Sequence, residues 1–148
     1  MVSKKKDDVK DLKLRDLKQA NIIIQIELLV TDKKRKFVEV DKILFLHPIN
    51  RKSALEKTQK RIEKLKRNFL GDEKELTKKD LDKIIPSITD MKIVAYKDNF
   101  VIWEGNGRLM AIKKVFKKDL KVEVVEYVLD EVGRKIVEKL LDDLFQEG

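Results

Sequence analysis

The apolar and polar positions in the first third of the chain predict a helix followed by extended segments. Residues 1–20 form a charged lead, in which residues 9–20 are expected to be helical with their leucines on one side. Residues 21–31 are an apolar run rich in isoleucine, and we interpret them as a strand because β-branched side chains favour extended backbone. A helix that continues the lead is the alternative, since the periodicity of so apolar a run fits both elements.

The next segment is predicted to stay extended after a turn. Residues 31–34 are polar and would turn the chain, so that residues 37–40 return as the hairpin partner of the preceding strand. The extended segment that follows ends in a loop around Pro48, because the residue before a proline is kept out of helical geometry.

Two helices are predicted after this loop from their capping residues. Ser53, with Glu56 three residues later, has the pattern of a capping box, and the helix is expected to cover residues 54–69. Thr77 is expected to be the N-cap of a shorter helix over residues 78–85, which has an acidic residue in its first turn.

A hairpin and two further helices complete the chain. Residues 91–96 and 100–103 are apolar runs separated by a tight polar turn, which predicts two antiparallel strands. Residues 109–116 have helical spacing, residues 120–127 alternate as a strand, and residues 130–145 form an amphipathic helix. The apolar stripe of this last helix would pack on its own sheet, which we favour, or pair two copies of the chain.

These elements predict an α+β fold with a small mixed sheet flanked by helices. A chain of 148 residues has the usual size of one compact domain and can bury a core. We interpret residues 1–36 as a charged N-terminal extension with a helix and a strand, and residues 37–148 as the domain itself, including the C-terminal helix.

The segment from Phe100 to Arg108 carries the strongest functional signal. An apolar strand runs through Gly105 and Gly107 into a helix, and the first N–H groups of a helix lack backbone partners. With the positive end of the helix dipole they form a site for phosphate or carboxylate, and Arg108 adds a planar fork for oxyanions. Glycines serve geometry alone at many such turns, but two glycines, Asn106 and an arginine within four positions favour a binding site.

The order of strand, Glu-Gly-Asn-Gly-Arg-Leu-Met-Ala, helix and strand resembles the ParB/sulfiredoxin superfamily. In ParB proteins the corresponding turn resembles Gly-Glu-Arg-Arg and helps to hold a nucleoside triphosphate. Free-serine kinases have an acidic residue followed by Gly-His-His-Arg at this turn. The resemblance covers residues 37–127 and implies a ParB/sulfiredoxin-like domain.

Two related chemistries are disfavoured by single positions. Sulfiredoxins have Gly-Cys-His-Arg at the turn, but Asn106 replaces the cysteine and the chain contains no cysteine, which excludes their chemistry. Fic-type AMP-transferases share the letters Gly-Asn-Gly-Arg, but Phe100 stands where their catalytic histidine is found. Their motif also lies between helices, whereas a strand is predicted here, so the Fic family remains a weak alternative.

The resemblance implies a nucleotide as the ligand, ATP or CTP or the corresponding diphosphate, with Mg²⁺ bridging its phosphates to a carboxylate. The Gly-Asn-Gly-Arg turn of residues 105–108 would hold the phosphates. If phosphotransfer takes place, Glu104 would be the general base and Arg108 would stabilise developing charge. Alternatively, Glu104 would accept a hydrogen bond from a backbone N–H at the start of the helix. We expect loss of the Arg108 side chain to abolish binding and to leave the fold intact.

The loop around Pro48 faces the nucleotide or substrate in ParB-like domains, which implies a second group of site residues. These residues are His47, Asn50, Arg51 and Lys52. An exposed loop position is the simpler interpretation of His47, and a lone histidine without a companion at ligand spacing predicts no metal site. Glu39 or Asp41, which precede the loop, could supply a further carboxylate.

Charge offers a second functional hypothesis. The net charge of +8 would attract nucleic acid, but the lysines alternate with acidic residues almost everywhere, as on solvated helix faces. No helix-turn-helix pattern is visible. The first hypothesis is a nucleotide-binding domain, with or without phosphotransfer or hydrolysis. The alternative is a non-enzymatic, DNA-associated module of ParB type. A nuclease is disfavoured because no cluster of carboxylates is evident.

The composition of the chain indicates in which cellular compartment we expect the protein. No apolar run approaches the roughly 18–20 residues that a membrane helix requires, and no signal peptide is visible. The absence of cysteine suits an intracellular protein. We therefore expect a cytoplasmic protein without a membrane partner. The sequence leaves the oligomeric state open, and a homodimer is one of the alternatives.

Overall fold

The computed structural model of the chain describes residues 2–47 and 52–146, with the side chains of residues 2–14 excepted. It divides into two compact units. One unit combines residues 1–31 with residues 129–148 and is a pair of helices, and the other comprises residues 32–128 and contains most of the sheet.

The helical unit consists of α1 (Val2–Leu29) and α5 (Glu131–Gln146). The helix predicted within the N-terminal lead is confirmed, but the strand predicted at residues 21–31 is wrong, because α1 continues to Leu29. Ile22 and Ile26 are one helical turn apart and both are buried. In a helix these side chains share one face, which packs against α5, and this packing outweighs their preference for strands.

The polar turn predicted at residues 31–34 is also wrong. These residues belong to β1 (Val30–Glu39), an edge strand that pairs with β6 (Lys121–Leu129) rather than with residues 21–31. Residues 31–35 have exposed polar side chains on this edge strand. Charged side chains are common on edge strands because they discourage pairing with other chains, so polarity here marks an edge and not a turn.

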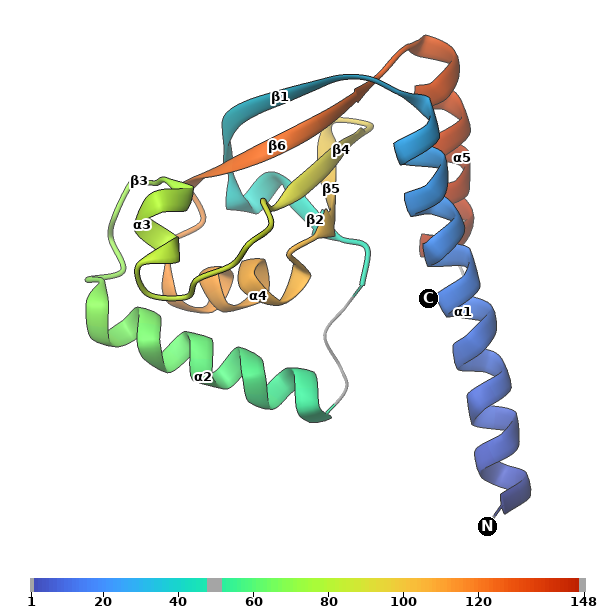
Figure 1. The fold of residues 1–148 in the computed structure, drawn as a ribbon, viewed down its shortest axis with the longest axis horizontal. Coiled ribbons are helices and arrows are strands. Elements are labelled where there is room, and N and C mark those ends of the chain that lie inside the picture. The colour runs from blue at the N-terminus through green and yellow to red at the C-terminus, as the bar shows by residue number, and fades with distance from the viewer. Residues whose placement is uncertain (1, 48–51, 147–148) are drawn as a thin grey trace. The chain divides into compact units, whose positions relative to one another are not determined.

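The described residues contribute six strands to one mixed sheet, in the order β1-β6-β4-β5-β2, with β3 (Glu75–Leu76) beside β6 (Figure 1). The predicted hairpin is confirmed, since β4 (Lys92–Tyr96) and β5 (Asn99–Glu104) pair antiparallel. The short β2 (Ile43–Phe45), which follows the 3-10 turn η1 (Val40–Lys42), pairs parallel with β5. The predicted α+β class with a small mixed sheet is therefore confirmed.

In the described part of the unit that holds the sheet there are three α-helices: α2 (Lys52–Asn68), α3 (Lys78–Asp82) and α4 (Asn106–Val115). Since α2 already includes Lys52, Ser53 lies inside the helix and is not its N-cap, which corrects that prediction. The prediction for Thr77 is confirmed. Its hydroxyl accepts the Asp80 N–H at 3.0 Å, and its own N–H donates to the Asp80 carboxylate at 3.3 Å.

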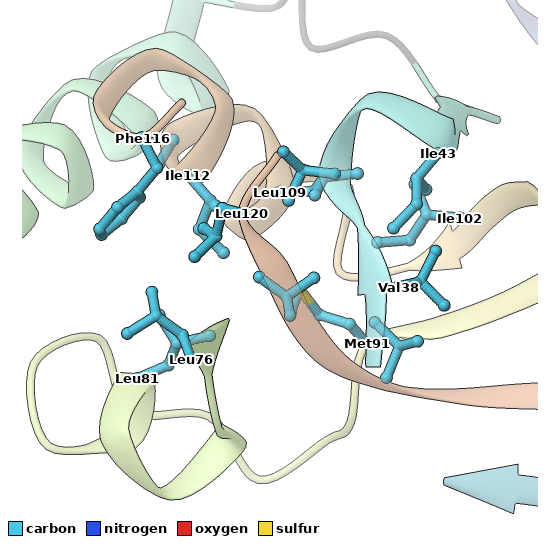
Figure 2. Packing of buried hydrophobic residues seen from close by; sticks show 14 of the residues in the cluster. Val38, Ile43, Leu76, Leu81, Met91, Ile102, Leu109, Ile112, Phe116 and Leu120 are labelled. Atoms are coloured by element: carbon cyan, nitrogen blue, oxygen red, sulfur yellow. The ribbon is translucent and has the colours of Figure 1, made fainter. Parts of the chain in front are cut away.

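The core of this unit lies between the sheet and α4. Helix α2 packs on the side of α4 that is turned away from the sheet (Figure 1). Figure 2 shows side chains of the sheet, α3 and α4 meeting in this core. Leu109 and Ile112 of α4 are completely buried. The burial of α4 fixes the position of its first turn, where the sequence predicts a binding site.

Asp130 caps α5, and its replacement tests this cap. Its carboxylate accepts the Gly133 N–H at 2.8 Å. We expect Asp130→Ala to lower the free energy of unfolding by about 1 kcal/mol, because a first-turn N–H loses its acceptor. Asp130→Asn keeps an acceptor and should lose much less in urea titrations of both variants. Equal losses in the two variants would assign the effect to charge and not to the cap.

Candidate anion site at the start of helix α4

Gly105 connects β5 to α4 in a conformation that favours glycine. Its φ is +96° and its ψ is 22°, in the left-handed region. Its carbonyl accepts the Leu109 N–H at 3.0 Å, the first hydrogen bond of the helix. A Cβ at this position would lie 2.7 Å from Cγ of Met91. The predicted sequence of strand, glycine turn and helix is thus confirmed.

The first turn of α4 presents unpaired donors. Among the residues that the structure describes, the N–H groups of Asn106, Gly107 and Arg108 have no acceptor. These donors lie at the positive end of a ten-residue helix. An anion placed before this turn would therefore meet both N–H donors and a favourable potential.

Asn106 ties the start of α4 to the segment after β2. It is 8% exposed, and its Oδ1 accepts the backbone N–H of His47 at 3.2 Å. The structure thus brings together two of the predicted site residues, with the Asn106 side chain serving as a tether. Lys52 is exposed in the first turn of α2, while Asn50 and Arg51 lie outside the described residues.

The guanidinium of Arg108 is hydrogen-bonded to the segment before β4. It is 8% exposed, and its guanidinium donates to the carbonyl oxygen of Thr89 at 2.8 Å and to the Thr89 hydroxyl at 3.0 Å. Burial lowers the pKa of this guanidinium below its ordinary value, and the charge of Glu104 opposes that change. The donors of Arg108 thus hold the segment before β4.

Glu104 shares this network. It ends β5, and its carboxylate accepts the Thr89 hydroxyl at 3.3 Å. The N-cap of α4 is Gly105, so Glu104 does not cap the helix. Glu39 ends β1 and Asp41 lies in η1. In the described part of the chain, no three His, Cys, Asp or Glu side chains gather as a metal site would require.

Arg61 of α2 is the site residue that sequence reasoning missed. A Cβ on Gly107 would lie 2.5 Å from Nη1 of Arg61, so this guanidinium lies directly against the first turn of α4. It is close enough to lower the pKa of Arg108 by charge repulsion. The described residues give Arg61 no carboxylate partner. The one signal in the sequence was Gly107 itself, since a glycine inside a helix often marks a close approach.

Comparison with known proteins adds no relative, because no family model, no curated protein and no solved structure matches the chain. The resemblance to the ParB/sulfiredoxin superfamily stays a prediction that rests on residues 104–111. Among the described residues, no helix has the length and apolar character needed to cross a membrane.

Proposed function

We propose that this chain binds a phosphate-bearing ligand, a nucleotide di- or triphosphate, at the start of α4. The observation that carries the proposal is the Arg61 guanidinium against Gly107, beside three backbone donors without acceptors in the described structure. A phosphate accepts several hydrogen bonds and carries negative charge, so it matches both features. The site thus joins two elements that are far apart in the sequence.

Each neighbouring residue has a defined part in this proposal. The first-turn N–H groups and Arg61 contact the phosphate oxygens, and Asn106 positions the segment that contains His47. Arg108 and Glu104 are joined through Thr89 and hold the turn in place. Mg²⁺, where it accompanies the nucleotide, would be held mainly by phosphate oxygens. We propose binding, with no reaction assigned to Glu104.

Removal of the Arg61 charge tests the site. We expect Arg61→Gln to weaken binding by about 10- to 100-fold, because a hydrogen bond from a charged donor contributes about 1.5–3 kcal/mol. A thermal-shift screen of ATP, ADP, CTP and GTP, with and without Mg²⁺, would identify the ligand, since a ligand of the native state raises Tm. Gly107→Ala should act in the same direction, because the new Cβ takes the place of Arg61 Nη1.

Measurements of stability distinguish a loss of binding in these two variants from damage to the fold. Gly107→Ala should keep or raise stability by up to about 1 kcal/mol, because alanine favours a helix over glycine. Arg67→Gln, which removes the same charge elsewhere on α2, is the matched control and should bind the nucleotide as the natural chain does. Unchanged affinity in both Arg61→Gln and Gly107→Ala would refute the site.

A second candidate function is a DNA-associated binding module, favoured by the charge of α2. This helix has seven Lys or Arg residues and two Glu. Lys57, Arg61 and Lys64 recur at helical spacing, and the described residues give the two lysines no carboxylate partner. Such a stripe suits the backbone of a nucleic acid. With a duplex oligonucleotide, Lys57→Gln would then lose affinity as Arg61→Gln does, and Gly107→Ala would not.

A further inference from the structure

Helices α2 and α4 lie side by side and run in the same direction (Figure 1). At the start of α4, Nη1 of Arg61 would lie 2.5 Å from a Cβ on Gly107. At the other end, the rings of Phe69 and Phe116, which directly follow the two helices, have centroids 5.5 Å apart. These two contacts are separated by eight residues along α2 and by nine along α4, so the helices stay level over this stretch.

Helix α2 begins well before α4 does. Because Arg61 is level with the first turn of α4, the nine preceding residues of α2 project past that turn by about 13 Å. We call these residues, 52–60, the α2 projection. The N–H groups of a helix point toward its N-terminus, so the free donors of α4 open toward the side on which the projection lies. A ligand that these donors hold therefore lies beside the α2 projection.

The α2 projection continues the positive charge of Arg61. Lys57 is exposed and precedes Arg61 by four positions, so the two residues share one side of the helix. Glu56 is the one acidic residue of the projection, and it points about 100° away from Lys57 around the helix. The described residues give neither Lys57 nor Arg61 a carboxylate partner. Uncompensated positive charge therefore leads from the start of α4 along α2.

Basic residues of β1 show the opposite arrangement, because their own chain compensates them. Arg35 lies 3.1 Å from the Asp90 carboxylate, and Lys36 lies 2.9 Å from that of Glu126. Opposite charges this close favour each other more than they favour an outside ion. A polyanion is therefore attracted to the side of α2 that carries Lys57 and Arg61 more than to these positions of β1.

The spacing along α2 fits the repeat of a nucleic-acid strand. Lys57 and Arg61 are about 6 Å apart along the helix axis, which corresponds to about two phosphates of a strand at about 3.4 Å each. The α2 projection contains no aromatic residue on which a base could stack. We therefore expect contacts to the sugar-phosphate backbone, with little preference for base sequence.

The donors at the start of α4 favour a terminal phosphate over an internal one. They are the Arg61 guanidinium and the N–H groups of Asn106, Gly107 and Arg108, which lack acceptors in the described structure. A terminal phosphate carries a charge of about −1.5 to −2 at pH 7 and offers three free oxygens. An internal phosphodiester carries one charge and leaves fewer oxygens free. The more highly charged group gains more from a guanidinium and a helix dipole together.

We propose that this surface binds the phosphorylated end of a nucleic-acid strand, with the terminal phosphate at the start of α4 and the strand leaving along the α2 projection. The site is that of the proposed function, on which this inference rests, and the nucleotide held there is the last one of a strand. Arg61 and the free N–H donors contact the terminal phosphate. Lys57 contacts the backbone one or two nucleotides further along.

Three forms of one single-stranded oligonucleotide test the proposal: phosphorylated at the 5′ end, at the 3′ end, and at neither end. Fluorescence anisotropy should show about 10- to 100-fold tighter binding of one phosphorylated form than of the unphosphorylated form, as expected for hydrogen bonds from charged donors. Gly107→Ala should remove this preference, because the new Cβ takes the place of Arg61 Nη1.

The salt dependence of binding tests the path of the strand. With the preferred oligonucleotide, Lys57→Gln should lower the slope of log K against log salt concentration by about one, the effect of losing one phosphate contact. Lys66→Gln is the matched control, since Lys66 is exposed and points to another side of the same helix, and it should leave the slope unchanged. Both lysines are exposed, so neither replacement should alter the urea midpoint.

Each remaining outcome has a defined meaning. Nucleotides that raise Tm, together with equal affinity for all three oligonucleotides, would overturn the strand end and leave the proposed function standing. No binding of nucleotides or of oligonucleotides would overturn both. Equal losses in Lys57→Gln and Lys64→Gln, without a preference for a terminal phosphate, would overturn the proposal in favour of a module that binds the backbone along the whole of α2.

Discussion

Gly105→Ala is expected to lower the free energy of unfolding by about 2–4 kcal/mol, since strain and overpacking add at this position. The φ of +96° lies in the left-handed region, where a side chain costs about 1–2 kcal/mol. The new Cβ would also lie 2.7 Å from Cγ and 3.3 Å from Cα of the buried Met91. The side chain of Met91 can move, but its Cα can shift only with the start of β4.

Gly107→Ala is the matched control for this substitution. Gly107 is two residues further along, has helical backbone, and faces only the flexible end of Arg61. Urea titrations of the two variants should therefore give a large loss for Gly105→Ala and little or none for Gly107→Ala. Similar free energies of unfolding for both would contradict the left-handed turn and the close approach of Met91.

The prediction of this turn from sequence succeeded because its determinants are local. A strand of β-branched and aromatic residues, two glycines and a run with helical spacing each act over a few residues. The hairpin before the turn and the N-cap at Thr77 were predictable for the same reason. Local chemistry was sufficient to place the start of α4.

The predictions for residues 21–34 were wrong because long-range packing determines the structure there. The isoleucines of residues 21–29 favour a strand by propensity, but helix α5, a hundred residues later, offers a partner for one helical face. Nothing near those residues in the sequence reports this partner. Residues 31–34 resemble a turn for a related reason, because the free edge of a sheet tolerates the same polar residues.

In the candidate site, too, local features were predicted from the sequence and contacts made by packing were not. Sequence reasoning found the glycines and Asn106, but it assigned the anion contact to Arg108 because that residue is adjacent in the chain. The guanidinium that lies against the free first turn belongs to Arg61, and only the packing of α2 on α4 places it there. Arg108, although adjacent, is directed to Thr89. The ParB/sulfiredoxin resemblance does not resolve this, since it stays a prediction.

Arg108→Ala is expected to destabilise the fold by about 2–4 kcal/mol, because a buried hydrogen-bond acceptor that loses its donor costs about 1–3 kcal/mol and the lost side chain leaves a cavity. The carbonyl oxygen of Thr89 loses its 2.8 Å bond, and the Glu104 charge loses its buried partner. The sequence alone predicted an intact fold for this variant. The structure reverses that expectation, since Arg108 fastens the segment before β4 to α4.

Urea titration and nucleotide affinity together separate the two arginines. Arg108→Ala should unfold at lower urea, and at temperatures where it is still folded it should retain most of its affinity. Arg61→Gln should show the converse, a stable fold with weakened binding. Arg108→Lys keeps the charge without the planar fork that contacts both oxygens of Thr89, so it should recover only part of the lost stability. A stable Arg108→Ala variant that no longer binds would return the anion contact to Arg108, and Arg61 would then be a solvated charge on α2.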